Sequence, residues 1–324
     1  MNLEALEKLY DKNDVSDLAL FLNSFNSVNE LIQFIHNRPR APISIYIENV
    51  DAGNDIIMVV PTPDFKDNRT QQFIKNFRDY KIIFVVSSGI YFNFSISMNA
   101  GIQEALKFNP EWIGLSNVDI SPITNTSQIR PIIRSHEPSV LIPRIFLPNG
   151  KKQRCACLIR TGKHVNYVLR KLHFLSKFLP VELRGQFLVS ALSIARKHEI
   201  IRYMTILNRY QEPYTRLHSI FLKIFFSIFH LHTLCFTNIQ PISFVHSAIL
   251  REYKFDEDFI NGGEDTELSI RMLRNGVSFR EIEYDVAREV GVYLGKSEVR
   301  LMRNSVIEVL VLGTKLNDYD FAFH

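Results

Sequence analysis

Hydrophobic and polar positions follow two periods along the first 120 residues. Short apolar runs at 43–48, 56–60, 82–86 and 112–115 predict β-strands. Between them, apolar residues recur three and four positions apart, which is typical of helices that bury one face. The apolar run at 17–22 predicts a further strand, and the capping box at 27–30 predicts a helix start behind it. This part of the chain therefore alternates strand and helix.

Strands that alternate with helices of this length predict an α/β fold, with a mostly parallel sheet covered by helices on both faces. Ligands of such sheets bind beyond the carboxyl ends of the strands. We therefore expect the functional loops at 23–26, 61–67, 87–97 and 116–121.

The pattern changes near residue 150. Residues 165–236 are dense in Leu, Phe and Ile among basic residues and predict a helical insert. Its most apolar part, 217–236, predicts a buried helix pair ahead of an interfacial membrane helix, and a transmembrane span is least favoured. A strand at 242–250 and helices at about 264–275 and 298–312 follow. The chain thus divides into 1–150, 151–240 and 241–324.

Composition limits the partners. The 324 residues are 46% hydrophobic and 22% charged, as expected for a globular protein. The net charge of +4 is too small to indicate a nucleic-acid partner. Three cysteines lack the spacing of a zinc site, and the first residues carry acids instead of an apolar run. We therefore expect a reduced, cytoplasmic protein.

Three segments together resemble a known enzyme family. They are Asn93–Ala105, which contains Asn99-Ala100-Gly101; Ser116–Pro122, which contains Asn117-Val118-Asp119; and Phe255–Arg271, which contains Gly263-Glu264-Asp265. In order and spacing they resemble the GT-A glycosyltransferases, family 2, rhamnosyltransferase-like branch, over about 17–123 and 242–312. The resemblance implies a Rossmann-like GT-A domain. Residues 1–150 would bind the nucleotide sugar, 151–240 would be a helical, Phe-rich insert, and 241–324 would form the acceptor and catalytic half.

The resemblance implies a role for the Asn-x-Asp segment. Asp119 at a strand end would hold Mn²⁺ or Mg²⁺ against the donor diphosphate, with Asn117 beside it. These ions prefer oxygen ligands and keep waters, so one or two protein carboxylates suffice. The alternative is that Asp119 merely caps the turn before Pro122.

The acidic pair Glu264-Asp265 follows a glycine loop at a helix start. The resemblance implies that Asp265 takes the proton from the acceptor hydroxyl in a direct, inverting displacement. Glu264 would raise the pKa of its neighbour by like-charge repulsion, whereas the helix terminus would lower it. The alternative is that the pair only caps the helix.

The resemblance also indicates a nucleotide site. Asn23, Ser24, Phe25 and Asn26 would bind the base, and Asn99 would lie at the donor-side helix start. The family's base-contacting Asp is absent from its usual strand end or displaced to Asp64 or Asp67. Many relatives have a metal-binding His near Gly291, where this chain has none, so either Arg288 or Lys296 neutralises the diphosphate or metal is bound weakly or not at all.

The partners expected are a nucleotide-sugar donor and a glycan, protein or lipid-linked acceptor. The basic insert at 151–240 suggests an acceptor platform or a peripheral contact with an anionic membrane. Two other functions stay open. A nucleotidyltransferase would need a Gly-rich signature that 23–26 lacks, and a catalytically inactive scaffold would explain the missing Asp and His.

Overall fold

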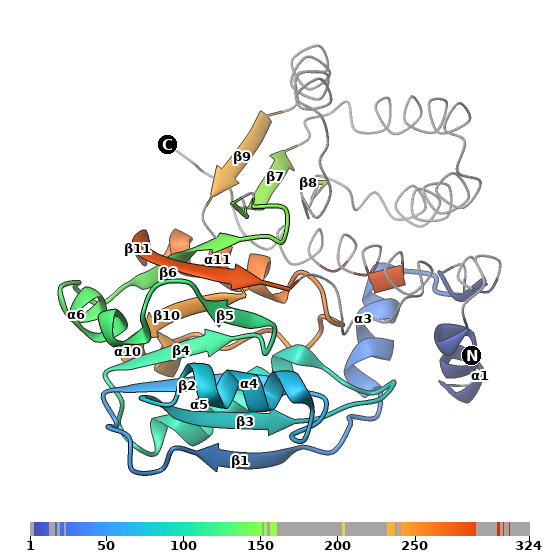
Figure 1. Ribbon diagram of the computed structural model, residues 1–324. Helices are drawn as coiled ribbons and strands as arrows, with labels where there is room; N and C mark the ends of the chain where they lie inside the picture. The colour runs from blue at the N-terminus through green and yellow to red at the C-terminus, as the bar shows by residue number, and fades with distance from the viewer. Residues whose placement is uncertain are drawn as a thin grey trace.

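The computed structural model describes residues 3–12, 17, 20–22, 24–150, 152–153, 156–160, 203–204, 232–236, 239, 241–289, 303–304, 307 and 311. Within these residues, an eight-stranded sheet has the order β1-β3-β2-β4-β10-β6-β11-β5 (Figure 1). Helices lie against the sheet, which confirms the α/β fold.

The strands of this sheet are β1 (Ser44–Glu48), β2 (Ile56–Thr62), β3 (Lys81–Val86), β4 (Trp112–Ser116), β5 (Ile120–Pro122), β6 (Val140–Phe146), β10 (Ile242–His246) and β11 (Phe279–Arg288). The helices are α1 (Leu3–Asp11), α3 (Val28–Asn37), α4 (Asn68–Asn76), α5 (Phe94–Leu106), α6 (Ile129–Arg134), α10 (Ser247–Glu252) and α11 (Glu264–Arg274). A 3₁₀ turn, Thr126–Gln128, precedes α6.

The sheet is mixed in direction. β2 is parallel to both β3 and β4, and β6 is parallel to β11. Antiparallel pairs join β1 to β3, β10 to β4 and β6, and β5 to β11. The parallel order predicted from strand–helix alternation therefore holds for the neighbours β3, β2 and β4, where helical crossovers connect the strands.

Alternate residues of the strands feed two cores, one on each face of the sheet. Met58, Phe84 and Trp112 point to the face covered by α4 and α6. Val59 and Val85 point to the opposite face, where α5 and α11 pack. Because both faces are buried, β2 reads as a continuous apolar run.

Residues 17–22 contradict the predicted strand. Residues 17 and 20–22 are helical, and Phe21 and Leu22 are fully buried. The ring of Phe21 packs edge-on against Tyr10, Phe25 and Phe34 at centroid distances of 5.6, 5.1 and 5.4 Å. A short apolar run fits a strand or a buried helix equally well, and here the aromatic cluster with α1 and α3 selects the helix.

The insert forms strands in its described part. β7 (Ala156–Arg160) pairs antiparallel with β8 (Tyr203–Met204) and with β9 (His232–Phe236). The helical prediction for 165–236 is therefore wrong at 203–204 and 232–236, and otherwise lies outside the described residues. No helix in the part of the chain that the structure describes is long and apolar enough to cross a membrane.

Two further predictions near the C-terminus are partly confirmed. The run 242–250 is a strand only as far as His246, whose Nδ1 accepts from the backbone N–H of Ala248 and starts α10. Residues 303, 304, 307 and 311 are helical, as predicted for 298–312, and the remainder of that prediction lies outside the described residues.

Candidate functional site

Three polar side chains from the loops predicted at strand ends lie at one edge of the sheet. Asp64 follows β2, Asn93 follows β3 and Asp119 follows β4. Because these three strands are parallel neighbours, their carboxyl ends meet at the same edge. In open α/β sheets this edge is where ligands bind.

The first turn of α5 is tied to residues 257–261. Asn93 caps α5, since its Oδ1 accepts from the N–H of Ile96 at 2.9 Å. Its Nδ2 donates to the backbone oxygens of Glu257 and Phe259 at 3.1 and 2.9 Å. Asn261 returns the contact by accepting from the N–H of Phe94 at 2.9 Å.

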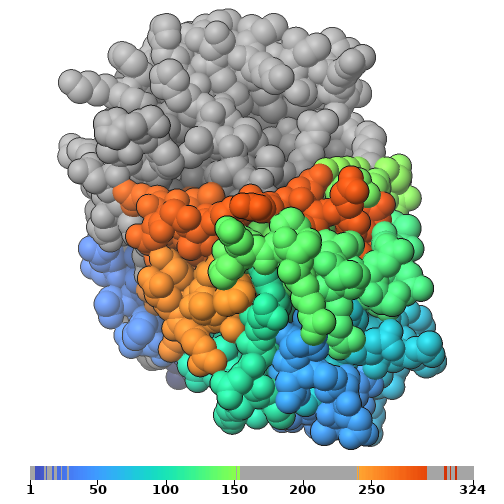
Figure 2. All heavy atoms as spheres, turned by 90° about the vertical axis from the view of Figure 1, so that its left-hand side faces the viewer, coloured from blue at the N-terminus to red at the C-terminus, as the bar shows by residue number. Residues whose placement is uncertain are grey.

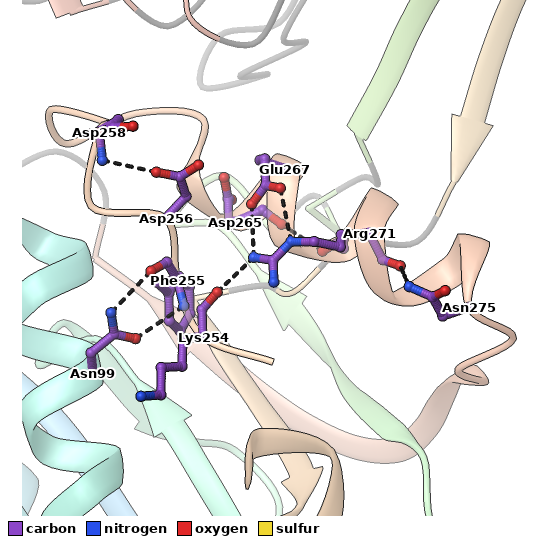
Figure 3. A network of polar contacts seen from close by, with 10 residues as sticks. Asn99, Lys254, Phe255, Asp256, Asp258, Asp265, Glu267, Arg271 and Asn275 are labelled. Carbon is purple, nitrogen blue, oxygen red and sulfur yellow. Dashed lines mark hydrogen bonds and ion pairs between the residues drawn. The ribbon is translucent and has the colours of Figure 1, made fainter. Parts of the chain in front are cut away.

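Asn99, nearly two turns further along α5, binds the backbone of the same loop. Its Nδ2 donates to the carbonyl oxygen of Phe255 at 2.9 Å, and its Oδ1 accepts from the N–H of Phe255 at 3.0 Å (Figure 3). The amide also donates to Glu257 Oε1 at 3.0 Å. The first and third segments of the family resemblance are thus joined. Asn99 is 8% exposed and faces the loop.

The acidic pair lies at the start of α11. Gly263 precedes it with φ of 91°, a left-handed conformation that glycine adopts without strain. Asp265 Oδ1 accepts from the N–H of Thr266 at 2.8 Å, and Glu264 is buried. The N-cap residue is Gly263, so neither acid occupies that position, and Asp265 binds one first-turn N–H with a side chain that is only half-buried.

An ion pair between Glu267 and Arg271, both in α11, helps to hold the loop that leads to Glu264-Asp265. Glu267, with a side chain 1% exposed, is held by Arg271 through Nε at 2.9 Å and Nη2 at 3.0 Å. Arg271 Nη2 also donates to the carbonyl oxygen of Lys254 at 2.6 Å, as Figure 3 shows. The side chain thus clamps the start of the 254–263 loop to α11.

Asp119 is buried beside an arginine. Its Oδ2 lies 3.3 Å from Arg288 Nε, and the two side chains are 9% and 19% exposed. Oδ1 is buried and has no hydrogen-bond partner among the described residues. Burial raises the pKa of Asp119, and the nearby positive charges of Arg288 and Arg69 oppose that rise. Asn117, two residues earlier, uses its backbone N–H to bind the Pro241 oxygen at 2.7 Å.

A second arginine, Arg69, is linked to Asp119 through Glu289. The backbone oxygen of Asp119 accepts from the N–H of Glu289 at 3.0 Å. The carboxylate of Glu289 lies 3.3 Å from Arg69 Nε on α4. Arg288 Nη1 donates to Gln153 Oε1 at 3.1 Å. Side chains from α4, from β11 and from the segment after β6 therefore meet around Asp119.

The residues predicted to bind the base of the nucleotide lie partly away from Asp119. Asn23 lies outside the described residues. Ser24 Oγ donates to the oxygen of Leu20 at 2.7 Å, Phe25 is buried in the N-terminal aromatic cluster, and the N–H of Asn26 donates to Glu30. Asp64 is exposed and accepts from the N–H of Lys66 at 2.8 Å. Asp67, the other predicted substitute, caps α4.

The residues around Asp119 fit a divalent cation poorly. The uncontacted Oδ1 supplies one oxygen ligand, but a cation bound there would lie next to the Arg288 guanidinium and be repelled by it. Among the described residues, no three His, Cys, Asp or Glu side chains are grouped to hold a metal. The positive charge of Arg288 therefore disfavours the metal-binding role expected of Asp119.

Sequence reasoning missed Arg69, Gln153 and Asn261. Nothing in the local sequence singles them out, because each acts on a residue far along the chain. Asn261 is one of the described residues with positive φ outside glycine, at 52°, which is uncommon and marks a constrained turn.

The opposite edge of the sheet, formed by the amino ends of the parallel strands, faces the viewer in Figure 2. A hollow lies there, away from the predicted loops. Its lining includes Arg130, which pairs with Asp55 at 2.8 Å. The other lining residues are Asn49, Asp51, Ala52, Gly53, Arg78, Asp79 and Ser127.

No family model matches the chain, and no curated protein matches it in sequence. Among solved structures, it is similar to S. aureus TarS 1-349 with 11% identity and a TM-score of 0.33, over 74% of this chain and 59% of that chain. It is also similar to A197 from STIV with 10% identity and a TM-score of 0.25, over 31% of this chain and 51% of that chain. The chain thus spans between half and three fifths of either structure.

Proposed function

We propose that this protein is a glycosyltransferase that moves a sugar from a nucleotide-sugar donor to an acceptor hydroxyl with inversion. The observation that carries the proposal is the attachment of the 255–261 loop to the start of α5. Through Asn93 and Asn99 this attachment brings the segment that leads into Glu264-Asp265 to the carboxyl end of β3. Asp119 lies at the same edge, at the end of β4.

In the proposed reaction, Asp265 accepts the proton of the acceptor hydroxyl while that oxygen attacks the anomeric carbon of the donor. The bond between that carbon and the diphosphate oxygen breaks, and the nucleoside diphosphate leaves with the electron pair. Positioned general bases contribute about 10²–10⁴-fold to such steps. The half-buried carboxylate of Asp265, oriented by the Thr266 N–H, suits this role.

A second group must stabilise the leaving diphosphate, on which negative charge grows during bond breaking. Among the described residues, Arg288 and Arg69 lie at the end of β4 and can supply positive charge there. Buried Glu264, next to Asp265, would set the protonation of the base through its own charge.

The test is release of nucleoside diphosphate from a panel of UDP-, GDP- and dTDP-sugars, measured with a phosphatase-coupled assay. We expect one donor to be cleaved, and Asp265→Asn to slow its cleavage by at least about 100-fold. Calorimetric titration of the matching nucleoside diphosphate should show unchanged binding in that variant.

Glu252→Gln, at the exposed end of α10, is the matched control and should leave the rate unchanged. Binding of a nucleoside diphosphate without any cleavage of its sugar conjugates would favour the catalytically inactive scaffold. If no nucleotide binds at all, the proposed function is wrong.

A further inference from the structure

Two arginines that are distant in sequence converge at the carboxyl end of β4. Arg288 is the last residue of β11, and the antiparallel pairing of β11 with β5 sets it opposite Ile120, beside Asp119. Arg69 lies in the first turn of α4, which follows β2, the neighbour of β4. Both arginines therefore come from elements that the sheet fixes in place.

The carboxylate of Asp119 holds one of these arginines in position. It accepts from Arg288 Nε at 3.3 Å, and Gln153 accepts from Nη1 of the same guanidinium at 3.1 Å. Two contacts on different nitrogens fix the plane of the guanidinium. A planar guanidinium fixed in this way is suited to bind phosphate oxygens with paired N–H groups.

One partner of Arg69, the carboxylate of Glu289, is easily exchanged. Glu289 is 68% exposed and lies 3.3 Å from Arg69 Nε. Exposed ion pairs of this kind contribute little to stability, so a diphosphate with higher charge can replace the carboxylate. Asp119, in contrast, is buried and stays with Arg288.

We propose that Arg69 and Arg288 form a diphosphate-binding subsite that works without a divalent cation, and that Asp119 is the positioning residue of Arg288. This inference rests on the proposed function, because the diphosphate is that of the nucleotide-sugar donor. It assigns to two arginines the charge neutralisation that the family resemblance assigns to Mn²⁺ or Mg²⁺ at Asp119, with Arg288 or Lys296 as a substitute.

The test is calorimetric titration of UDP, GDP, dTDP and inorganic pyrophosphate into the full chain, in EDTA and again with Mn²⁺ or Mg²⁺. We expect at least one nucleoside diphosphate to bind in EDTA with an affinity within about threefold of that in Mn²⁺. Arg288→Gln and Arg69→Gln should each weaken this binding by at least about tenfold.

Arg280→Gln, which changes an exposed arginine on the same strand β11, is the matched control and should change the affinity by less than twofold. Arg288→Lys keeps the charge and should recover part of the lost affinity. Arg69→Gln changes a partly exposed side chain, so it serves where loss of the Arg288 ion pair impairs folding. Near-ultraviolet circular dichroism checks the fold of each variant.

The outcomes separate the two proposals. Binding that requires Mn²⁺ or Mg²⁺ and survives Arg288→Gln would overturn the arginine subsite and leave the proposed glycosyltransferase intact. Binding of pyrophosphate alone in EDTA, weakened by both arginine substitutions, would support the subsite and count against the nucleotide-sugar donor. No binding of any of the four compounds would overturn both.

Discussion

Asn99 on α5 and Phe255, 156 positions later in the sequence, exchange two hydrogen bonds through one amide side chain. The amide side chain of Asn99 binds both the backbone N–H and the backbone C=O of Phe255, as a neighbouring β-strand would. Together with Asn93 and Arg271, this side chain holds the loop that leads to Asp265. The position of Asp265, the proposed catalytic base, therefore depends on this contact.

Asn99→Ala should lower the free energy of unfolding by about 2–3 kcal/mol, because it leaves buried backbone groups of Phe255 without partners. Urea unfolding can be followed through the fluorescence of Trp112, the chain's one tryptophan, which is 1% exposed in the core. Asn37→Ala, at the exposed end of α3, should change stability by less than about 0.5 kcal/mol. Equal effects of the two substitutions would contradict the role of Asn99.

Arg271→Met should destabilise the protein by about 3 kcal/mol, because it leaves the buried carboxylate of Glu267 without its bidentate partner. The double variant Glu267→Leu/Arg271→Met should be more stable than Arg271→Met alone, since no unpaired charge then remains buried. A double-mutant cycle by urea unfolding measures the coupling. Strictly additive effects would show that the pair is not coupled.

Asp55 should make acid stability depend on its arginine partners. Burial acts to raise the pKa of Asp55, but the hydrogen bond from Arg130 and the charges of Arg130 and Arg134 outweigh burial and lower it. A carboxyl whose pKa is lower in the folded state stabilises the fold above its ordinary pKa of about 4, and this contribution is lost as the pH falls through the folded value. Asp55→Asn should therefore destabilise the protein by about 1 kcal/mol at pH 7.

The difference between wild type and Asp55→Asn should shrink as the pH falls below about 4, as measured by urea unfolding across a pH series. Asp51→Asn, exposed in the turn before Asp55, is the control and should change stability by less than about 0.5 kcal/mol at pH 7. A difference that stays constant down to pH 3 would contradict the assigned ion pair.

Gly101→Ala should destabilise the protein by about 1–3 kcal/mol through overpacking. An added Cβ would collide with Val59 Cγ1 and would lie 2.8 Å from Val85 Cγ2, so α5 would have to move away from the sheet. Gln103→Ala, on the exposed side of the same helix, is the control for thermal unfolding. An unchanged melting temperature for Gly101→Ala would show that this close approach is not required.

Much of the local structure could be predicted from residue pattern. The strands at 56–60, 82–86 and 112–115, and the helices after Asp67 and Gly263, were evident because burial on a strand or on one helix face imposes a period on the sequence. The residue pattern does not reveal the helix at 20–22. Its apolar run is too short for its period to show, and the rings of Tyr10 and Phe34 decide its structure.

The sequence by itself determined which polar side chains follow the strands: Asp64, Asn93 and Asp119 at the carboxyl edge, and Glu264-Asp265 at a helix start. Only the tertiary structure decided their partners. Asp119 lies beside Arg288 because β11 returns next to β5, and Phe255 lies on Asn99 because α5 and the loop before α11 share one face of the sheet. Periodicity reports which residues are buried, whereas pairs separated by more than 150 positions depend on the order of the strands, which no local pattern records.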